Sequence, residues 1–316
     1  MTGTVIRHRK IGWLLGVFSL VCLCFWVGCG GSRQLRPETA GGDREFDRSS
    51  RMARFAFDNG QIPQAIKRYQ RALGRAYLAD DLKGIVDTLY NLAVCHLRQG
   101  NYAESRVHAE KAQFEWTAAG HSVHANLLLV QAVALYHLGF PDRSRQISAD
   151  ILSIRPAASP ETLSRTHFLR GIMAADQGDS DLVQLAITAL GEPSLPALQA
   201  DRLELIGRLA LLDERWDDAA AAFDQTARMR AANRNYRLMA TALANAGHAC
   251  ERAKRLEDGA YRYFKAARSA ALSGDTTRAD VWIQESMRLA EKSGALSLLQ
   301  AARHLQRMAV DDSQPQ

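Results

Sequence analysis

The feature that most constrains this chain is a spacing pattern that occurs six times. In residues 90–105, "YNLAVCHLRQGNYAES", apolar residues at helical spacing stop at Gly100 and resume at Tyr102. Counted from the small residue Ala93, a turn residue follows after seven positions, a second small residue, Ser105, after twelve, and a third, Ala112, after nineteen. Such repetition indicates stacked modules rather than one irregular core. The six units begin at Ala53, Ala93, Ala132, Gly171, Gly207 and Gly247.

Each unit predicts two antiparallel helices joined by a short turn. Helices approach closely where small residues face each other, so Ala93 and Ser105 let the two helices of their unit touch. Gly100 ends the first helix because glycine accepts a positive φ without strain. One such hairpin cannot bury its apolar face, whereas several stacked hairpins form a continuous core. Long Ala, Leu, Arg and Glu stretches with only 8 Pro, and no strand-like alternation, predict an all-α chain.

This pattern resembles the tetratricopeptide repeat (TPR) family over residues of about 46–273, with units one, two, five and six close to it. The unit starts are 40, 39, 39, 36 and 40 residues apart, whereas the family spacing is about 34 and HEAT or armadillo spacing about 40. The preserved span inside each unit places the additional residues in the connections, which favours the TPR interpretation. The resemblance implies an all-α, right-handed superhelical TPR-like solenoid of about six helical hairpins plus C-terminal capping helices. We expect repeats over 48–273, capping helices over 274–310, about fourteen helices in an open stack, and a disordered tail over 311–316.

The N-terminal residues predict a targeting signal rather than part of the folded body. Arg7, Arg9 and Lys10 precede the uncharged stretch of residues 11–27, which is typical of a secretory signal. Residues 26–29, Trp-Val-Gly-Cys, resemble the lipobox of bacterial lipoproteins, although Trp26 departs from its usual aliphatic residue. This predicts a lipoprotein signal peptide over 1–28, lipidation of Cys29 and a flexible tether over 29–47. An uncleaved inner-membrane signal anchor is the alternative, because the apolar stretch reaches the lower limit for spanning a membrane.

Charge and motifs narrow the classes of function. Removal of residues 1–28 lowers the net charge from +6 to +3, so the sequence predicts no nucleic-acid partner. His121 and His124 lack ligands at metal spacing, and no phosphate loop or activated nucleophile is evident. We therefore expect no enzyme activity, no cofactor and no metal. Cys95 and Cys250 are expected to be small buried residues rather than a disulfide.

In the TPR family the first helix of each unit lines a concave groove that holds a protein or peptide partner. By this resemblance, Asn91 and Asn245 correspond to asparagines that hold a peptide backbone, although solvated asparagines are the alternative. The apolar side chains of units three and four predict an exposed stripe, unless tight curvature buries them against neighbouring first helices. The predicted groove residues are Arg51, Arg54, Tyr90, Asn91, Val94, Leu97, Arg98, Leu129, Val133, Tyr136, Phe168, Ile172, Asn245, His248 and Arg252.

Together these features predict a membrane-anchored periplasmic TPR scaffold or adaptor for protein–protein interactions in cell-envelope assembly. Outer-membrane protein insertion, pilus biogenesis and recruitment of peptidoglycan enzymes remain open, as does the oligomeric state. Gly30 after Cys29, where an aspartate favours inner-membrane retention, favours a lipid anchor in the outer membrane with the body facing the periplasm. The alternative is a glycan-binding repeat lipoprotein for nutrient capture.

Overall fold

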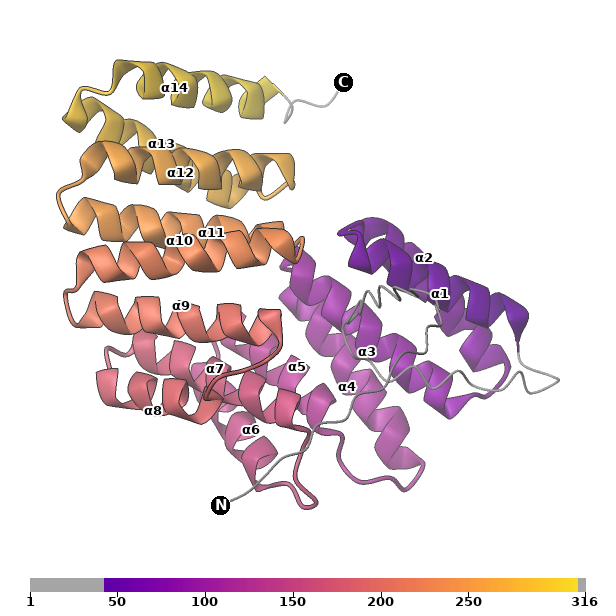
Figure 1. The fold of residues 1–316 in the computed structure, drawn as a ribbon. Helices are drawn as coiled ribbons and strands as arrows, with labels where there is room; N and C mark the ends of the chain where they lie inside the picture. The colour runs from indigo at the N-terminus through magenta and orange to yellow at the C-terminus, as the bar shows by residue number, and fades with distance from the viewer. Residues whose placement is uncertain (1–42, 312–316) are drawn as a thin grey trace, which may run out of the picture. The chain divides into compact units, whose positions relative to one another are not determined.

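A computed structural model describes residues 43–311, which form fourteen α-helices and no strand (Figure 1). The predicted signal peptide, Cys29, most of the predicted tether and residues 312–316 lie outside the described part. The all-helical prediction is confirmed. The helices are α1 (Arg44–Asp58), α2 (Ile62–Leu78), α3 (Leu82–Gln99), α4 (Tyr102–Ala118), α5 (Ala125–His137), α6 (Pro141–Ser153), α7 (Pro160–Asp176), α8 (Ser180–Leu190), α9 (Pro196–Leu212), α10 (Trp216–Ala232), α11 (Tyr236–Arg252), α12 (Leu256–Leu272), α13 (Thr276–Ser293) and α14 (Leu296–Asp311).

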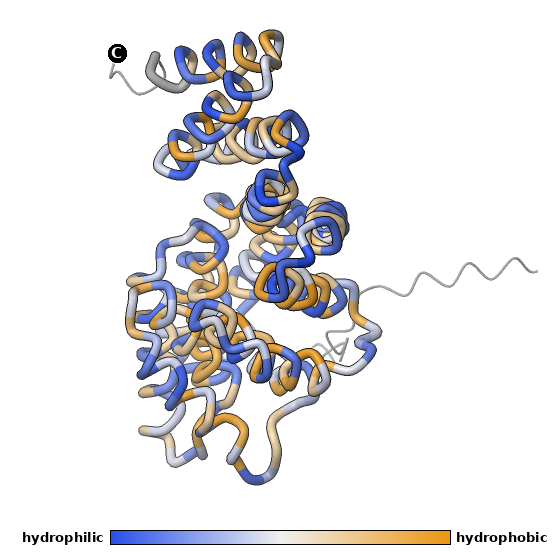
Figure 2. The backbone as a smooth tube through the Cα atoms, turned by 90° about the vertical axis from the view of Figure 1, so that its left-hand side faces the viewer, coloured by the Kyte–Doolittle hydropathy of each residue, from blue (hydrophilic) through white to orange (hydrophobic). Residues whose placement is uncertain are grey.

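The helices stack in chain order as hairpins. Each predicted unit is one pair, from α1 with α2 to α11 with α12, and each helix packs against the next along the chain. α13 packs on α12, and α14 contacts both α12 and α13. Hydrophilic and hydrophobic residues alternate around the turns of the helices (Figure 2), so one side of each helix is available for burial.

The turn inside each hairpin has the same backbone conformation in all six units. The residue seven positions after the unit start has a positive φ, and it is glycine in the first four units. In the fifth and sixth units Glu214 and Lys254 take this conformation, with φ of 57° and 64°. The turn is therefore conserved in geometry even where the favourable glycine is missing.

Small residues let the paired helices touch, as the spacing predicts. Ala93 and Ser105 are fully buried, and the Ser105 hydroxyl donates a hydrogen bond to the Ala93 carbonyl at 2.8 Å. In the last repeat, a Cβ atom added to Gly259 would lie 3.0 Å from the Gly247 carbonyl oxygen. Contacts this close leave no room for larger side chains at these positions.

The first helix begins earlier than the sequence predicts. Asp43 caps α1, because its carboxylate accepts hydrogen bonds from the backbone amides of Glu45 and Phe46. The same carboxylate forms an ion pair with Arg75 on α2 at 2.7 Å. Residues 44–47, assigned above to the tether, are thus part of α1, because an aspartate cap fixes the helix start more strongly than composition suggests.

Two further expectations concern membranes and cysteines. Among the helices between residues 43 and 311, none is both long enough and apolar enough to span a bilayer. Cys95 and Cys250 are both buried and free. They occupy the cores of separate hairpins, as small apolar side chains.

The surroundings of two helical glycines predict opposite effects for their substitution by alanine. A Cβ atom at Gly171 on α7 would lie 2.7 Å from a methyl of the fully buried Leu205 and 2.8 Å from the Ala186 Cβ, which moves only with α8. Gly171→Ala should therefore lower the free energy of unfolding by about 1–3 kcal/mol. Gly74→Ala on α2, where nothing lies within 4 Å, should raise it by about 0.5–1 kcal/mol. Urea unfolding monitored by circular dichroism measures both, and shifts of the same sign would contradict the packing account.

Candidate functional site

The apolar stripe predicted on units three and four is not an exposed wall. α3 contacts α5, α5 contacts α7, and α7 contacts α9, so the first helices touch one another in this region. Leu129 is 8% exposed and Ile172 is 6% exposed, while Val133 and Phe168 are half-buried against the same clusters. The alternative interpretation is therefore the one that the packing supports: close first helices bury these side chains.

The other predicted groove residues of the first two hairpins differ in how far they are exposed. Tyr90, Asn91, Val94 and Leu97 are half-buried on α3. The Asn91 amide donates to the Asp87 carbonyl of its own helix at 2.8 Å, so its side chain is partly engaged. Arg51 and Arg54 are exposed on α1.

The predicted residues on α11 lie along one side of that helix. Asn245 is half-buried, whereas His248 and Arg252 are exposed. The Arg252 guanidinium lies 4.5 Å from the centroid of the Trp216 ring. With Arg237 and Thr241, these residues follow one another at intervals of three or four, which places all five on one face.

The structure brings together a set of polar side chains that sequence reasoning mostly missed. They are contributed by the first helices α5, α7, α9, α11 and α13, together with the start of α4 and the residue that caps α13. We call this set the polar cluster. It consists of Tyr102, Tyr136, His137, Asp176, Arg208, Arg237, Asp275 and Arg278.

One part of the polar cluster ties three first helices together. The Tyr136 hydroxyl on α5 donates a hydrogen bond to the Asp176 carboxylate at the end of α7. Arg208 on α9 donates to the other oxygen of Asp176 at 3.1 Å. Burial, followed by the hydrogen bond to Asp176, raises the pKa of Tyr136, so the phenol keeps its proton at neutral pH. Tyr136 was predicted as a groove residue, and here its hydroxyl is fixed in place.

Arg208 is held by a buried set of ion pairs between α9 and α10. Arg230 on α10 forms ion pairs with Asp201 and Glu204 of α9, and all three side chains are largely buried. Glu204 also pairs with Arg208 at 3.5 Å. Removing one partner from a buried set like this leaves an uncompensated charge, so the set holds α9 and α10 in one arrangement.

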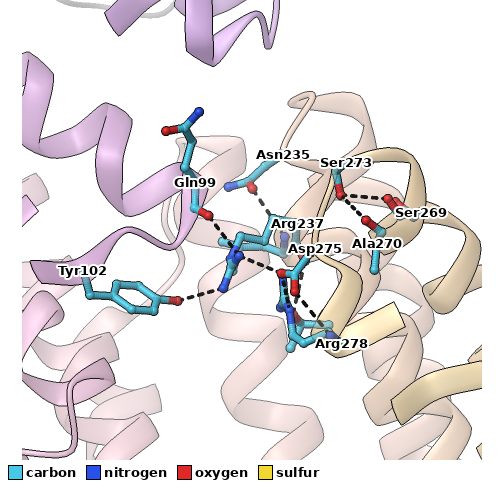
Figure 3. A network of polar contacts seen from close by, with 11 residues as sticks. Gln99, Tyr102, Asn235, Arg237, Ser269, Ala270, Ser273, Asp275 and Arg278 are labelled. Atoms are coloured by element: carbon cyan, nitrogen blue, oxygen red, sulfur yellow. Dashed lines mark hydrogen bonds and ion pairs between the residues drawn. The ribbon is translucent and has the colours of Figure 1, made fainter. Parts of the chain in front are cut away.

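The second part of the polar cluster surrounds Arg237 (Figure 3). Its guanidinium donates to the Gln99 carbonyl at 3.1 Å, the Tyr102 hydroxyl at 3.2 Å and the Asp275 carboxylate at 2.8 Å. Arg278 donates to the same carboxylate at 2.7 Å. Burial acts to raise the pKa of Asp275, but the hydrogen bond and charge of Arg278 and the charge of Arg237 outweigh it, and the pKa is lowered. Asp275 is therefore a carboxylate that fixes two guanidinium groups.

Arg237 belongs to a larger contact between distant hairpins, which we call the cross-hairpin contact. Arg98 on α3 donates to the Asn233 carbonyl at 3.5 Å, and its guanidinium lies 4.6 Å from the Phe57 ring centroid. Arg234 donates to the Asn59 side chain. Turns of the first two hairpins thus meet the connection between α10 and α11, where the sequence suggested an open stack. Arg98, which the sequence predicts as a groove residue, takes part in this contact.

His137 lies in the middle of the polar cluster with more than a third of its surface accessible. Its ring stacks on Tyr102 with 4.2 Å between centroids and lies 4.9 Å from the Tyr136 ring. Partial burial disfavours the charged imidazolium, and the nearby positive charges of Arg237 and Arg278 disfavour it further. Together they lower the pKa of His137 to about 4. At neutral pH the imidazole therefore offers one donor and one acceptor.

The polar cluster combines several kinds of polar and aromatic groups. Among residues 43–311, no group of three or more His, Cys, Asp or Glu side chains is placed to hold a metal ion. The cluster offers guanidinium donors, carboxylate acceptors, a neutral imidazole and aromatic faces, most of them held by hydrogen bonds to other protein groups. Side chains that are already fixed lose little entropy when a ligand binds.

Comparison with known proteins identifies the fold. Residues 48–113 match the family model described as Tetratricopeptide repeat. No protein of curated function is a significant match to the sequence. The structure is similar to a Rap protein complexed with competence and sporulation factor, at 12% identity over 81% of this chain and 76% of that one, with a TM-score of 0.55.

Two further solved structures are similar. The apo form of the quorum sensor NprR from B. thuringiensis aligns at 13% identity over 86% of this chain and 89% of that one, with a TM-score of 0.52. The apo form of RapI aligns at 13% identity over 84% of this chain and 97% of that one, with a TM-score of 0.51. At these identities the likeness establishes the fold, which is an all-helical TPR-like solenoid.

The cross-hairpin contact predicts that Arg237→Ala loosens the chain. The substitution removes the hydrogen bonds to Gln99 and Tyr102 and leaves Asp275 with Arg278 alone. We expect a larger radius of gyration by small-angle scattering and a loss of about 1–2 kcal/mol in the free energy of unfolding. Arg252→Ala, which removes only the stacking on Trp216, is the matched control. An unchanged radius of gyration for Arg237→Ala would contradict the account.

The environment of His137 predicts a pH dependence of stability. The unfolded chain takes up a proton near pH 6.5, whereas His137 in the folded chain stays neutral down to about pH 4. The stability of the folded chain therefore decreases as the pH falls from about 6.5 to about 4. His137→Gln should reduce this decrease, measured by urea unfolding across that window. In Arg237→Gln, NMR titration should show the pKa of His137 shifted upwards, and an unshifted pKa would argue against the charge effect.

Proposed function

We propose that this chain is a scaffold that holds a segment of a partner protein along the face that carries the polar cluster. The main observation that supports this proposal is the polar cluster, in which groups from successive first helices are fixed by one another and remain partly accessible. An extended peptide presents alternating amide donors and carbonyl acceptors, and the cluster offers both kinds of complement. The Arg237 face of α11 continues this surface through Asn245 and His248.

The fold supports a role in protein–protein interaction. TPR solenoids serve as scaffolds because stacked hairpins present a long surface. One solved structure of similar fold, the Rap protein, is in complex with competence and sporulation factor. Exposed aromatic side chains such as Phe55, Phe114 and Tyr261 lie on three different helices. This scatter gives no support to glycan capture, and the fold favours protein binding.

The N-terminal sequence supports a proposal about location. We propose that the signal residues 1–28 are removed, that Cys29 is lipidated, and that the scaffold is anchored in the outer membrane and faces the periplasm. There it acts as an adaptor in cell-envelope assembly, of the kind that serves outer-membrane protein insertion, pilus biogenesis or recruitment of peptidoglycan enzymes. Lipidation with tethering concentrates the scaffold where envelope partners work.

Site-specific photocrosslinking in the native cells tests this function. A photoreactive residue at exposed position 248 should form an adduct with one envelope protein. The same residue at exposed position 71 on α2 should form no such adduct. Absence of the adduct at position 248, or equal adducts at both positions, would refute binding along this face.

The same experiment in a Cys29→Ala background tests the anchor. Loss of lipidation should move the chain from the membrane fraction and reduce the adduct several-fold, because the local concentration of scaffold falls. A Cys29→Ala protein that remains membrane-bound with its adduct intact would favour the uncleaved signal anchor.

A further inference from the structure

A second surface lies on the opposite side of α11 from the polar cluster. A groove of about 600 Å³ runs between α10 and α12, with the N-terminal half of α11 as its floor. Residues of an α-helix are separated by about 100° around the axis. Tyr236, Met239 and Leu243 in the groove are therefore opposite Arg237 and Thr241. We call this surface the outer groove.

The outer groove is apolar inside. Its apolar lining consists of side chains from all three helices, and two of them are exposed: Leu272 at 85% and Tyr236 at 49%. Exposed apolar side chains gathered in a concave surface usually mark an interaction site. The apolar lining residues are Ala227, Ala231, Tyr236, Met239, Leu243 and Leu272.

The rims of the outer groove are positively charged. Arg228 lies on α10, and Lys265 and Arg268 lie on α12. Within residues 43–311, none of these three forms an ion pair. The Lys265 ammonium and the Arg268 guanidinium each lie 5.5 Å from the ring centroids of Tyr261 and Phe264, respectively. The groove therefore has three cations on its rims that no ion pair neutralises within the described residues.

The one acidic residue that lines the groove does not change this balance. Asp224 accepts hydrogen bonds from Arg262, with a shortest distance of 2.8 Å, and is already neutralised. A guest that brings carboxylates to the rims gains attraction to three charges, and its apolar side chains gain burial against the floor. The complement of the outer groove is thus acidic and amphipathic.

We propose that the outer groove binds an acidic amphipathic helix of a partner protein. A helix lying between α10 and α12 on α11 repeats the packing that the solenoid uses between its own helices, with apolar residues at i, i+3, i+4 and i+7 facing the floor. The chain's own residues 1–42 do not fit this role by charge, because they hold five basic residues and one acidic residue. This site is separate from the polar cluster, so the scaffold binds a second partner independently of the first.

A designed peptide tests the outer groove on the full chain in detergent. The probe is a fluorescein-labelled helix of about 18 residues with leucines on one face and about six glutamates flanking them. Fluorescence anisotropy at low ionic strength should show saturable binding that weakens with salt. Lys265→Glu with Arg268→Glu should weaken binding at least about tenfold.

Two matched controls come from α2, which is also a second helix. Arg68→Glu with Arg71→Glu makes the same change of charge at the same spacing and should leave binding within about twofold of the original. Leu272→Asp should weaken binding about tenfold, whereas Leu78→Asp should not. Leu78 and Leu272 each end a second helix, at 79% and 85% exposure. Circular dichroism of all four variants is the control for retained helicity.

Several results would overturn the proposal. These are the absence of saturable binding, an equal loss in the α2 controls, or equal binding of a probe with lysines in place of its glutamates. Sedimentation velocity that shows a dimer dissociated by Leu272→Asp would assign the groove to a second copy of the chain. Binding to phosphatidylglycerol vesicles that requires Lys265 and Arg268, without binding of the probe, would assign it to a membrane. None of these results affects crosslinking at position 248, which tests the other face of α11.

Discussion

The close contact between paired helices is the constraint on which the other features depend. Ala93 and Ser105 are fully buried, and a side-chain hydroxyl reaches the carbonyl of the opposite helix. Gly171 lies against Leu205 and Ala186 with no room for one more carbon atom. Helices held this near leave few ways to place the next hairpin, because packed side chains allow only a few arrangements. Local spacing in the sequence thus determines the geometry of the stack.

That geometry brings together residues that are far apart in sequence. In the middle of the chain the first helices contact one another, which buries Leu129 and Ile172 and brings Tyr136, Asp176 and Arg208 within hydrogen-bonding distance. It also lets the turns of the first two hairpins reach the connection before α11. Each exposed hydrogen bond in the cross-hairpin contact contributes only about 1 kcal/mol. The contact is therefore a consequence of the packing that it reinforces, rather than its main cause.

The sequence predicts the hairpins well because their signals are local. The six units, their turns and the small residues at the helix interfaces all follow from spacings of fewer than twenty residues. Even the turns at Glu214 and Lys254, which lack the favourable glycine, lie seven positions after the start of their unit, as the pattern predicts. The start of α1 was missed because the capping hydrogen bonds of Asp43 count for more than the polar composition around it.

The candidate site was predicted only in part, because it depends on distant contacts. Tyr136 was identified from its place on a first helix. Arg237, Asp275 and Arg278 were not, since nothing near them in sequence shows that Gln99 and Tyr102 lie opposite. The contact of Arg98 with Asn233 could not be foreseen for the same reason. The sequence does show charged residues near the ends of several first helices. It does not show how many hairpins make one turn of the superhelix, and that number determines which helix ends meet.

The two proposed surfaces share α11, so they can influence each other only through the arrangement of that helix. Tyr236 lies in the outer groove and Arg237, the next residue, holds the cross-hairpin contact. A ligand changes an equilibrium between two arrangements only by the difference in its affinity for them. A helix bound between α10 and α12 touches none of the groups that bridge to α3 and α4. It therefore alters binding at the polar cluster only if it also changes the angle of α11. Helix α11 resists such a change, because Asp275 pairs with its Arg237 and because Gly247 and Gly259 hold it close to α12. The physical expectation is two independent sites on one rigid helix.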